Sequence, residues 1–315
     1  MRHGTTLIQL IVMIAGVGLL AILLFPAVQS AQEEQNFLMC RKNLHEIGIG
    51  FHNYHDINGF LPSGRIGHNN GVFSQLLPYV EQQNLAAALS AEFDTWQDPD
   101  VNDKAAWFST DTGWELCQTK ISLFVCPSAD AAGLGKAKRN VAGMKFSVED
   151  KTAEMTLQYL DTSEADGIAG LSTYGPCAGA AGFHFVEDEN AGAFTSAREG
   201  MFSSQRRKVI TQILDGTSNT LGIGEYLGEY DEDKEAWTLS GSWAAATMMW
   251  TAKPLAESAQ KATYAQFSSP HEGINNFVLG DASVFPLSTK VDLQVLRDIG
   301  GIRDGNIVDL GTVNR

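Results

Sequence analysis

A histidine and an aspartate in the C-terminal half could act together on a ligand, or each could stabilise a turn. His271 begins the run HEGINNFVLGDASV, and Asp281 lies near its end. Residues 276–280 between them are expected to form a strand, and five extended residues span about 16 Å. The two side chains are therefore too far apart to form a direct pair. We interpret both as turn-building residues at the ends of this strand, with a ligand or recognition role as the alternative.

A second motif, DGTSNTL, contains Asp215, Gly216 and Asn219. These residue types form tight turns, because their side chains satisfy loop backbone or tolerate unusual backbone angles. We therefore predict a turn between two strands at this motif.

Carboxylates downstream of this turn could bind Ca²⁺, which takes about six to eight oxygen ligands. The candidates are Glu225, Asp231 and Asp233. The sequence has no EF-hand pattern, however, and acidic runs are usually solvated surface. We predict no cofactor and keep Ca²⁺ as the alternative.

Two histidines and an aspartate on one expected helix could bind a transition metal. His45, His52 and Asp56 share a helix face, but His45 and His52 are two turns apart and cannot easily share one ion. We interpret this face as polar surface that bonds to neighbouring loops or strands.

The four cysteines allow two disulfides in three connectivities, or free buried thiols. No C-x-x-C pair is present, which makes a zinc ribbon a poor fit. We predict a bond between Cys126 and Cys177, because both stand at the ends of expected core strands. Cys40 and Cys117 form the remaining pair.

Composition and missing motifs narrow the functional classes. The chain has 315 residues and a net charge of −15, which argues against nucleic acid as a partner. It contains no G-x-S-x-G elbow, no P-loop and no dinucleotide fingerprint. We do not expect an enzyme, and an anchored hydrolase ranks third among the alternatives.

The candidate residues above must be positioned by helices and strands, and the first of these is an apolar run near the N-terminus. Residues 7–25 contain Gln9 as their only strongly polar side chain. As a helix they would be about 28 Å long, close to the thickness of a bilayer's hydrocarbon core. The small residue Gly4 precedes this run, so cleavage there would leave the run on the mature protein. Arg2 favours a cytoplasmic N-terminus, and we predict a single-pass protein of the cytoplasmic membrane.

The helix is expected to continue beyond the membrane. Apolar residues then recur at steps of three and four, which draws one stripe for a globular domain: Phe37, Cys40, Leu44, Ile47, Phe51 and Tyr54. We predict one helix over residues 6–57, a kink at Pro26 and an end at Asn58 and Gly59.

The remaining sequence predicts an antiparallel β-rich body. Strands are expected at 121–125, 183–186, 209–214, 220–224, 276–280 and 283–287. Helices are expected at 73–89 and 291–299, and residues 131–167 read as an insertion with some helix. Six tryptophans could offer stacking surfaces for a glycan, but most tryptophans belong to cores.

Several motifs together resemble one family. The N-terminal run GTTLIQ resembles a class III prepilin leader. The further motifs are LLFPAVQSA, CRKNLHEIG, HNYHD, FVCPS, DGTSNTL and HEGINNFVLGDASV. The chain is similar to the planctomycete-type prepilin-like family with an N-terminal cleavage/methylation motif and a C-terminal H-X9-DG processing-associated domain. The biochemical role of that family is largely undefined.

The resemblance implies a pilin-like α+β fold, with one long helix packed on an antiparallel sheet that carries large loop insertions. It implies a leader at 1–4, a membrane half of the helix at 5–26, an amphipathic half at 27–58 and an exported domain at 59–315. A prepilin peptidase would cut between Gly4 and Thr5 and could methylate Thr5.

The chain departs from the family at two positions. Pilins carry Glu at the fifth mature position, where this chain has Gln9, so the charge that pairs with a neighbouring subunit's amine is missing. The family has Gly where this chain has Ala282. An alanine with positive φ there would cost about 1–2 kcal/mol, unless Asp281 or Gly280 adopts that angle.

The expected function is a structural subunit of a type IV pilus or type II secretion-like assembly. The expected partners are the membrane, a prepilin peptidase and other pilin-like subunits or secretion machinery, not nucleic acid. The alternative is a permanently anchored surface protein that binds a glycan or envelope partner.

Overall fold

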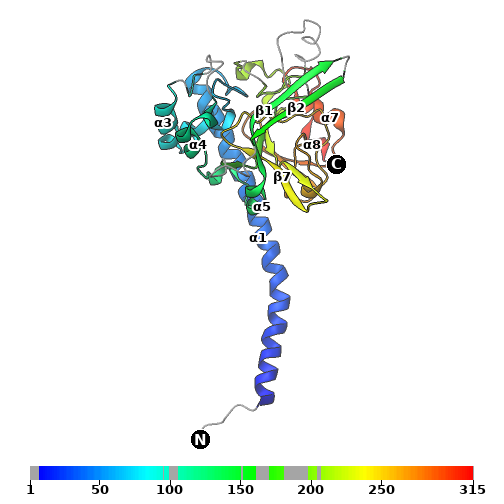
Figure 1. Ribbon diagram of the computed structural model, residues 1–315. Coiled ribbons are helices and arrows are strands. Elements are labelled where there is room, and N and C mark those ends of the chain that lie inside the picture. Colours follow the sequence, from blue (N-terminus) through cyan, green and yellow to red (C-terminus); the bar gives the residue numbers. More distant parts are fainter. Residues whose placement is uncertain are drawn as a thin grey trace.

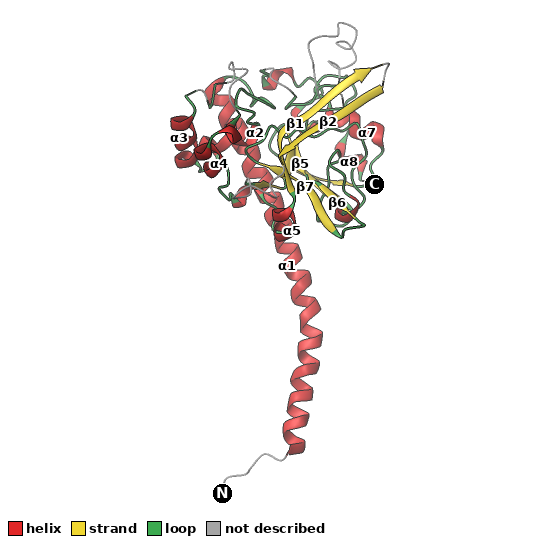
Figure 2. Cartoon of the chain, in the orientation of Figure 1, coloured by secondary structure: helices red, strands yellow, loops and turns green. Residues whose placement is uncertain are grey.

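A long N-terminal helix projects from a body of sheets and short helices (Figure 1). The computed structural model describes residues 7–94, 96–98, 106–149, 152–160, 170–180, 198–203 and 207–314. The first helix, α1, covers Leu7–Asn58, as predicted for residues 6–57. Its C-terminal half enters the body and its N-terminal half extends away from it (Figures 1 and 2). The fold is therefore α+β, with a long helix on antiparallel sheets.

The predicted apolar stripe anchors the C-terminal half of α1 in the core. Cys40, Leu44, Ile47 and Phe51 are fully buried, because their spacing puts them on the face toward the sheet. The helix ends where Gly59 adopts a φ of +79° and donates its N–H to the carbonyl of His55 at 2.7 Å. This left-handed glycine is the expected way to close a helix.

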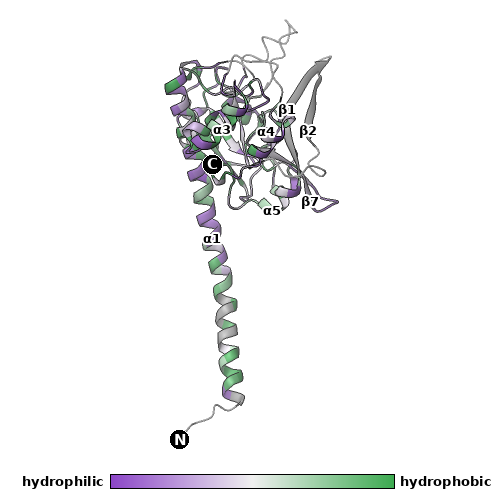
Figure 3. Ribbon diagram, turned by 60° about the vertical axis from the view of Figure 1, so that its left-hand side comes forward, coloured by the Kyte–Doolittle hydropathy of each residue, from purple (hydrophilic) through white to green (hydrophobic). Residues whose placement is uncertain are grey.

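The N-terminal half of α1, residues 7–28, is called the shaft below. The helix continues through Pro26, and its ribbon curves only gently (Figure 1). Many large apolar side chains of the shaft are exposed, which Figure 3 shows as green segments far from the body. They are Leu10, Ile11, Val12, Met13, Ile14, Leu19, Ile22, Leu24, Phe25 and Val28.

No helix among the described residues is both long and apolar enough to cross a membrane. The segment predicted to do so, residues 7–25, includes seven side chains outside those that the structure describes, so it stays a prediction. Arg2, Gly4 and Thr5, on which the predicted orientation and cleavage rest, also lie outside the described residues.

Four antiparallel strands form the sheet that α1 packs against. They are β4 (Tyr174–Pro176), β5 (Leu221–Glu225), β8 (Ile274–Leu279) and β9 (Val284–Ser288), in the order β4-β5-β8-β9. The strands predicted at 220–224, 276–280 and 283–287 are thus confirmed to within two residues.

A second sheet contains the strands β2 (Thr152–Leu160), β1 (Lys138–Glu149), β7 (Ala236–Ser242) and β3 (Leu171–Ser172), with β6 (Glu229–Asp231) also paired to β7. It is antiparallel except where β1 pairs with β7. The predicted insertion at 131–167 holds the short helix α5 (Ala131–Lys136), as expected, followed by the long β1–β2 hairpin. Figure 1 shows this hairpin reaching beyond the body, and it was not predicted.

Several predicted elements are wrong. The segments 121–125 and 209–214 are not strands but single 3-10 turns, Ser122–Phe124 and Ile210–Gln212. A short apolar run does not distinguish a strand from a buried helical turn, which explains both errors. The predicted strand at 183–186 lies outside the described residues.

The predicted helix at 73–89 is interrupted twice: near Pro78, which has no N–H to continue the helical bonds, and at Glu81, which has a φ of +61°. Its parts are α2 (Val72–Leu76), the 3-10 turn Leu77–Tyr79 and α3 (Gln83–Glu92). The predicted C-terminal helix is confirmed as α7 (Leu293–Gly300). Shorter helical elements are Trp107–Ser109, α4 (Asp111–Leu116), Thr217–Asn219, Ala259–Lys261 and α8 (Leu310–Val313).

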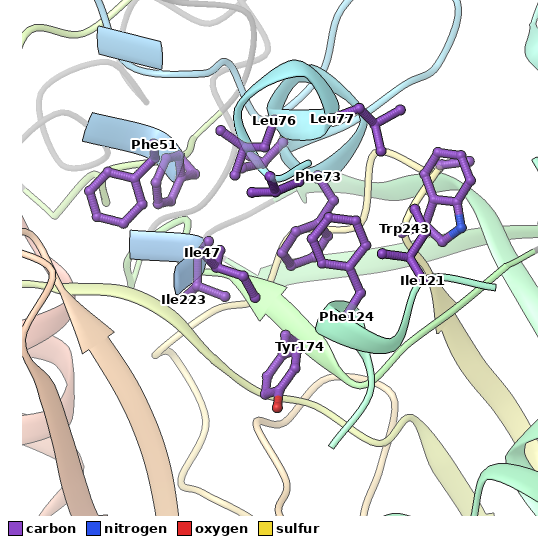
Figure 4. Packing of buried hydrophobic residues seen from close by; sticks show 14 of the residues in the cluster. Ile47, Phe51, Phe73, Leu76, Leu77, Ile121, Phe124, Tyr174, Ile223 and Trp243 are labelled. Carbon is purple, nitrogen blue, oxygen red and sulfur yellow. The ribbon is translucent and has the colours of Figure 1, made fainter. Parts of the chain in front are cut away.

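The core lies between α1, α2 and the first sheet. Figure 4 shows Ile47 of α1 beside Ile223 of β5, and Phe73 beside Phe124, whose ring centroids are 4.9 Å apart. All six tryptophans are buried or partly buried against core residues, as expected for core rather than stacking residues: Trp96, Trp107, Trp114, Trp237, Trp243 and Trp250.

Candidate functional site

A disulfide between Cys40 and Cys126 fastens α1 to the turn that follows Ser122–Phe124. The two Cα atoms are 5.0 Å apart, and the residues are separated by 86 positions in the sequence. The predicted Cys126–Cys177 and Cys40–Cys117 disulfides are therefore wrong. Cys117 and Cys177 are free thiols, and both are buried. The error follows from the missing strand at 121–125. Because that segment is a turn against α1, Cys126 faces the helix and not the end of a strand.

His271 lies directly against this disulfide. Its Nε2 atom is 3.5 Å from Sγ of Cys126 and 3.3 Å from Oε1 of Glu225, and its Nδ1 atom is 3.1 Å from Oε1 of Glu33. A ring with a carboxylate at each nitrogen is satisfied best as imidazolium, which has two donors. Burial lowers the pKa of His271, but the contacts with Glu225 and then Glu33 outweigh it, so the pKa lies above its usual value.

Glu225 ends strand β5 and is fully buried. Its Oε2 atom accepts hydrogen bonds from the Ser269 hydroxyl at 2.7 Å and from the backbone N–H of Asn276 at 2.9 Å. Its Oε1 atom has no aligned hydrogen bond to any described residue and faces His271 as an ion pair. A buried carboxylate is costly unless it is paired, so His271 and Glu225 depend on each other.

The other end of the HEGINNFVLGDASV motif also contacts α1. Asp281 has the predicted turn role, because its Oδ1 accepts from the N–H and the hydroxyl of Ser283. Ala282 has a φ of +66°, which settles the question left open by the sequence, and its carbonyl lies 2.9 Å from Nδ1 of His45. The turn role predicted for the His271 side chain is wrong, since that side chain reaches Glu225 and Glu33.

The motif around Asp215 forms the predicted turn, although a 3-10 turn and not a strand precedes it. Gly216 has a φ of +96°, and the Asn219 amide donates to the carbonyl of Asp215 at 3.2 Å. The Asp215 carboxylate accepts the backbone N–H groups of Asp304 and Gly305, which fixes a second loop to this turn. These contacts are structural.

The structure does not assemble the Ca²⁺ ligands named from the sequence. Asp231 accepts the backbone N–H of Asp233 and pairs with Lys234 at 2.6 Å, so it organises an exposed turn. Glu225 belongs to the buried group around His271 instead.

Of the polar face predicted on α1, His45 bonds to a neighbouring turn, whereas Nε2 of His52 is buried without a hydrogen-bond partner among the described residues. His45 bonds to Ala282, and Nε2 of His55 accepts the N–H of Ile210 at 3.4 Å. His52 and Asp56 do not join a metal-binding group among the described residues.

One cluster of metal-ligand types is nonetheless present in the described part of the chain. Cys40, Cys126, Glu225 and His271 each offer a ligand atom, and these atoms lie within 4.8 Å of one another. This group is called the junction cluster below. Sequence reasoning had noted each residue separately, but the four come from distant segments, and no spacing pattern joins them.

Residues 29–294 match the model of a family described as "Protein of unknown function (DUF1559)". The chain belongs to this family. No curated protein and no solved structure shows significant similarity to the chain. The matched range contains all four residues of the junction cluster as well as Glu33.

This DUF1559 chain also has a small cavity of about 100 Å³, lined by Glu199, Arg207, Lys208, Gln212, Ile302 and Arg303. Glu199 and Lys208 form a buried ion pair at 3.0 Å, and the Ser203 hydroxyl bonds to both. Arg303 lies 3.8 Å from the same carboxylate. Because these opposite charges already pair inside the cavity wall, we assign them a structural role.

Proposed function

We propose that the protein is a pilin-like structural subunit whose shaft anchors an exported domain in the cytoplasmic membrane. The observation that carries this proposal is the exposure of the shaft's apolar side chains, from 48% for Leu10 to 71% for Ile22. A contiguous exposed apolar surface of this kind marks a site that contacts lipid or protein. Residues 7–25 would span about 28 Å as a helix, which fits a bilayer.

The junction between shaft and body supports the same proposal. An anchored subunit needs its helix fixed to its domain, and here a disulfide and the Glu33–His271 ion pair both join α1 to the body. Glu33 also accepts the Ser128 hydroxyl at 2.8 Å, next to the disulfide turn. The position of the shaft in a membrane or assembly would therefore set the position of the domain.

Processing is the second part of the proposal. A prepilin peptidase cuts between Gly4 and Thr5, and a pilus or secretion-like machine exports the body while the N-terminus stays cytoplasmic. Intact-mass measurement of protein purified from its native membrane tests this step. Retention of residues 1–4 on most molecules would reject it.

Charged substitutions test the membrane anchor. Ile11→Arg combined with Ile14→Arg puts two charges in the N-terminal part of the shaft, inside the predicted span, at a cost of up to roughly 5–7 kcal/mol in a bilayer. The variant should move from the carbonate-resistant membrane pellet to the supernatant. Ile49→Arg with Ile57→Arg is the matched control, because these isoleucines are also exposed on α1 but lie outside the shaft. Equal pellet fractions for both double variants would contradict the proposal.

A second candidate is a surface protein that is anchored permanently and never polymerises. Gln9 favours it, since this position lacks the carboxylate that pilins pair with a neighbour's amine. The two candidates differ in where the native protein is found. A subunit of a fibre appears in sheared surface material, whereas a permanent anchor stays in the detergent-soluble membrane.

A further inference from the structure

The junction cluster brings together three types of side chain that bind metal ions: cysteine, histidine and glutamate. Two sulfurs, an imidazole nitrogen and a carboxylate oxygen lie within 4.8 Å of one another, and all four residues are buried. We propose that reduction of the Cys40–Cys126 disulfide converts this cluster into a closed Zn²⁺ site with two thiolate, one imidazole and one carboxylate ligand. Four-coordinate sites of sulfur and nitrogen ligands are typical of structural zinc.

The distances around His271 already suit such a site. In a tetrahedral zinc site with bonds of about 2.0–2.3 Å, neighbouring ligand atoms are roughly 3.3–3.8 Å apart. The Nε2 atom of His271 is 3.5 Å from Cys126 Sγ and 3.3 Å from Glu225 Oε1. The two sulfurs are too close for such a site, because they are bonded to each other. Breaking that bond lets the sulfurs separate, and the remaining ligand atoms, all within 4.8 Å of one another, have to close to these distances around the ion.

The surrounding contacts orient the ligands in the way metal sites require. Glu33 faces Nδ1 of His271, which leaves Nε2 directed toward the sulfurs. This carboxylate–histidine arrangement fixes the ring in known metal sites. Ser269 and Asn276 occupy Oε2 of Glu225, whereas Oε1 has no aligned hydrogen bond among the described residues and points into the cluster. In the oxidised protein this oxygen pairs with His271 at 3.3 Å, and the metal would take the place of that contact.

The conversion balances in atoms and charge. A dithiol gives two electrons and two protons to the disulfide, which yields two cysteine thiols and the disulfide of the reductant. Zn²⁺ then displaces the two thiol protons and the proton on Nε2 of His271, so binding releases protons. The metal replaces the imidazolium as the positive partner of Glu225. Disulfide and zinc are therefore alternative states of one site, and each joins α1 to the same turn and sheet.

Cobalt reports this site directly in the full-length protein. Detergent-solubilised protein is reduced with excess dithiol, freed of it by gel filtration under nitrogen and titrated with Co²⁺. We expect a thiolate-to-cobalt charge-transfer band and the intense visible bands of tetrahedral cobalt, which saturate at one ion per chain and disappear when Zn²⁺ is added. The oxidised protein should show neither. Reduced protein that keeps its far-ultraviolet circular dichroism but gives no bands would overturn the proposal.

Variants assign the ligands. Cys126→Ser should reduce the charge-transfer band to half or less, because only the Cys40 thiolate remains, and Cys117→Ser is the matched control, because that buried thiol lies outside the cluster and should leave the band intact. Glu33→Gln should keep the bands and weaken affinity roughly 10–100-fold, as expected for a positioning residue. Bands of full strength in Cys126→Ser, or in oxidised protein, would place the metal elsewhere and reject the site.

Discussion

The Oε1 atom of Glu33 lies 3.1 Å from Nδ1 of His271, although the two residues are 238 positions apart in the sequence. Glu33 stands where α1 enters the body, and His271 opens the C-terminal motif. The side chain of Glu33 is 54% exposed, whereas that of His271 is 5% exposed. One half-exposed carboxylate thus connects the base of the shaft to a buried histidine.

Removing the charge of this carboxylate should loosen the junction. Glu33→Gln weakens the contact with His271 and the bonds from Ser128, and we expect a loss of about 1 kcal/mol in unfolding free energy, since the pair is partly solvated. Glu34→Gln is the matched control, because it changes the neighbouring exposed carboxylate. Urea unfolding followed by tryptophan fluorescence measures both. Equal stability of the two variants would show that the contact contributes nothing.

The free cysteines should be unreactive in the folded protein. Burial raises the pKa of Cys177 to about 12 and that of Cys117 well above its usual value, so neither forms thiolate near neutral pH. Alkylation of native protein at pH 8 should add no mass. After unfolding without reductant, two adducts should appear, at Cys117 and Cys177. Adducts at Cys40 or Cys126 would contradict the disulfide between them.

The contact between α1 and the β8–β9 hairpin should not tolerate a methyl group at Gly48. A Cβ atom there would lie 2.7 Å from Cγ2 of Val278 and 2.9 Å from Cβ of Ala282. Gly48→Ala should therefore destabilise the protein by about 1–3 kcal/mol. Gly135→Ala in α5 is the control: no heavy atom lies within 4 Å of its Cβ position, and a gain of roughly 0.5–1 kcal/mol is expected. Thermal unfolding that ranks the two variants in the opposite order would reject this packing.

A carboxylate at position 9 should promote assembly. Gln9→Glu restores a charge-assisted bond to a neighbour's amine, and such bonds are about twice as strong as neutral ones. If the protein is a fibre subunit, the variant should pellet from sheared surface material in larger amounts than the unmodified chain. No difference would favour the permanent anchor, and abundant homopolymer from the unmodified chain would show that Gln9 already suffices.

The sequence pattern predicted the buried face of α1 and three strands of the first sheet correctly. The stripe from Cys40 to Tyr54 predicted the buried face of α1, because helical spacing alone fixes which residues share a face. The runs that form β5, β8 and β9 are bounded by turn residues and were recognisable for that reason. The 3-10 turn at Ser122–Phe124 was not recognisable, because a short buried apolar run looks the same in the sequence whether it forms a turn or a strand.

The site could not be assembled from the sequence. Cys126 contacts Cys40 only because the turn before it packs on α1, and His271 reaches Glu225 only because β5 and β8 are neighbours. Each of these contacts depends on distant parts of the chain.

The positive φ of Ala282 was recognised as one of three options, because the strain can fall on any residue of a tight turn.

The disulfide also determines how the protein responds to mechanical force. Tension between the shaft and the C-terminal part of the chain passes covalently from Cys40 to Cys126 through this bond. The intervening residues 41–125 are bypassed, so they add no length when the molecule is pulled. While the disulfide is intact, the pulling force passes through the two sulfur atoms and the backbone. The packing of Leu44, Ile47 and Phe51, which lie in the bypassed segment, does not have to resist that force.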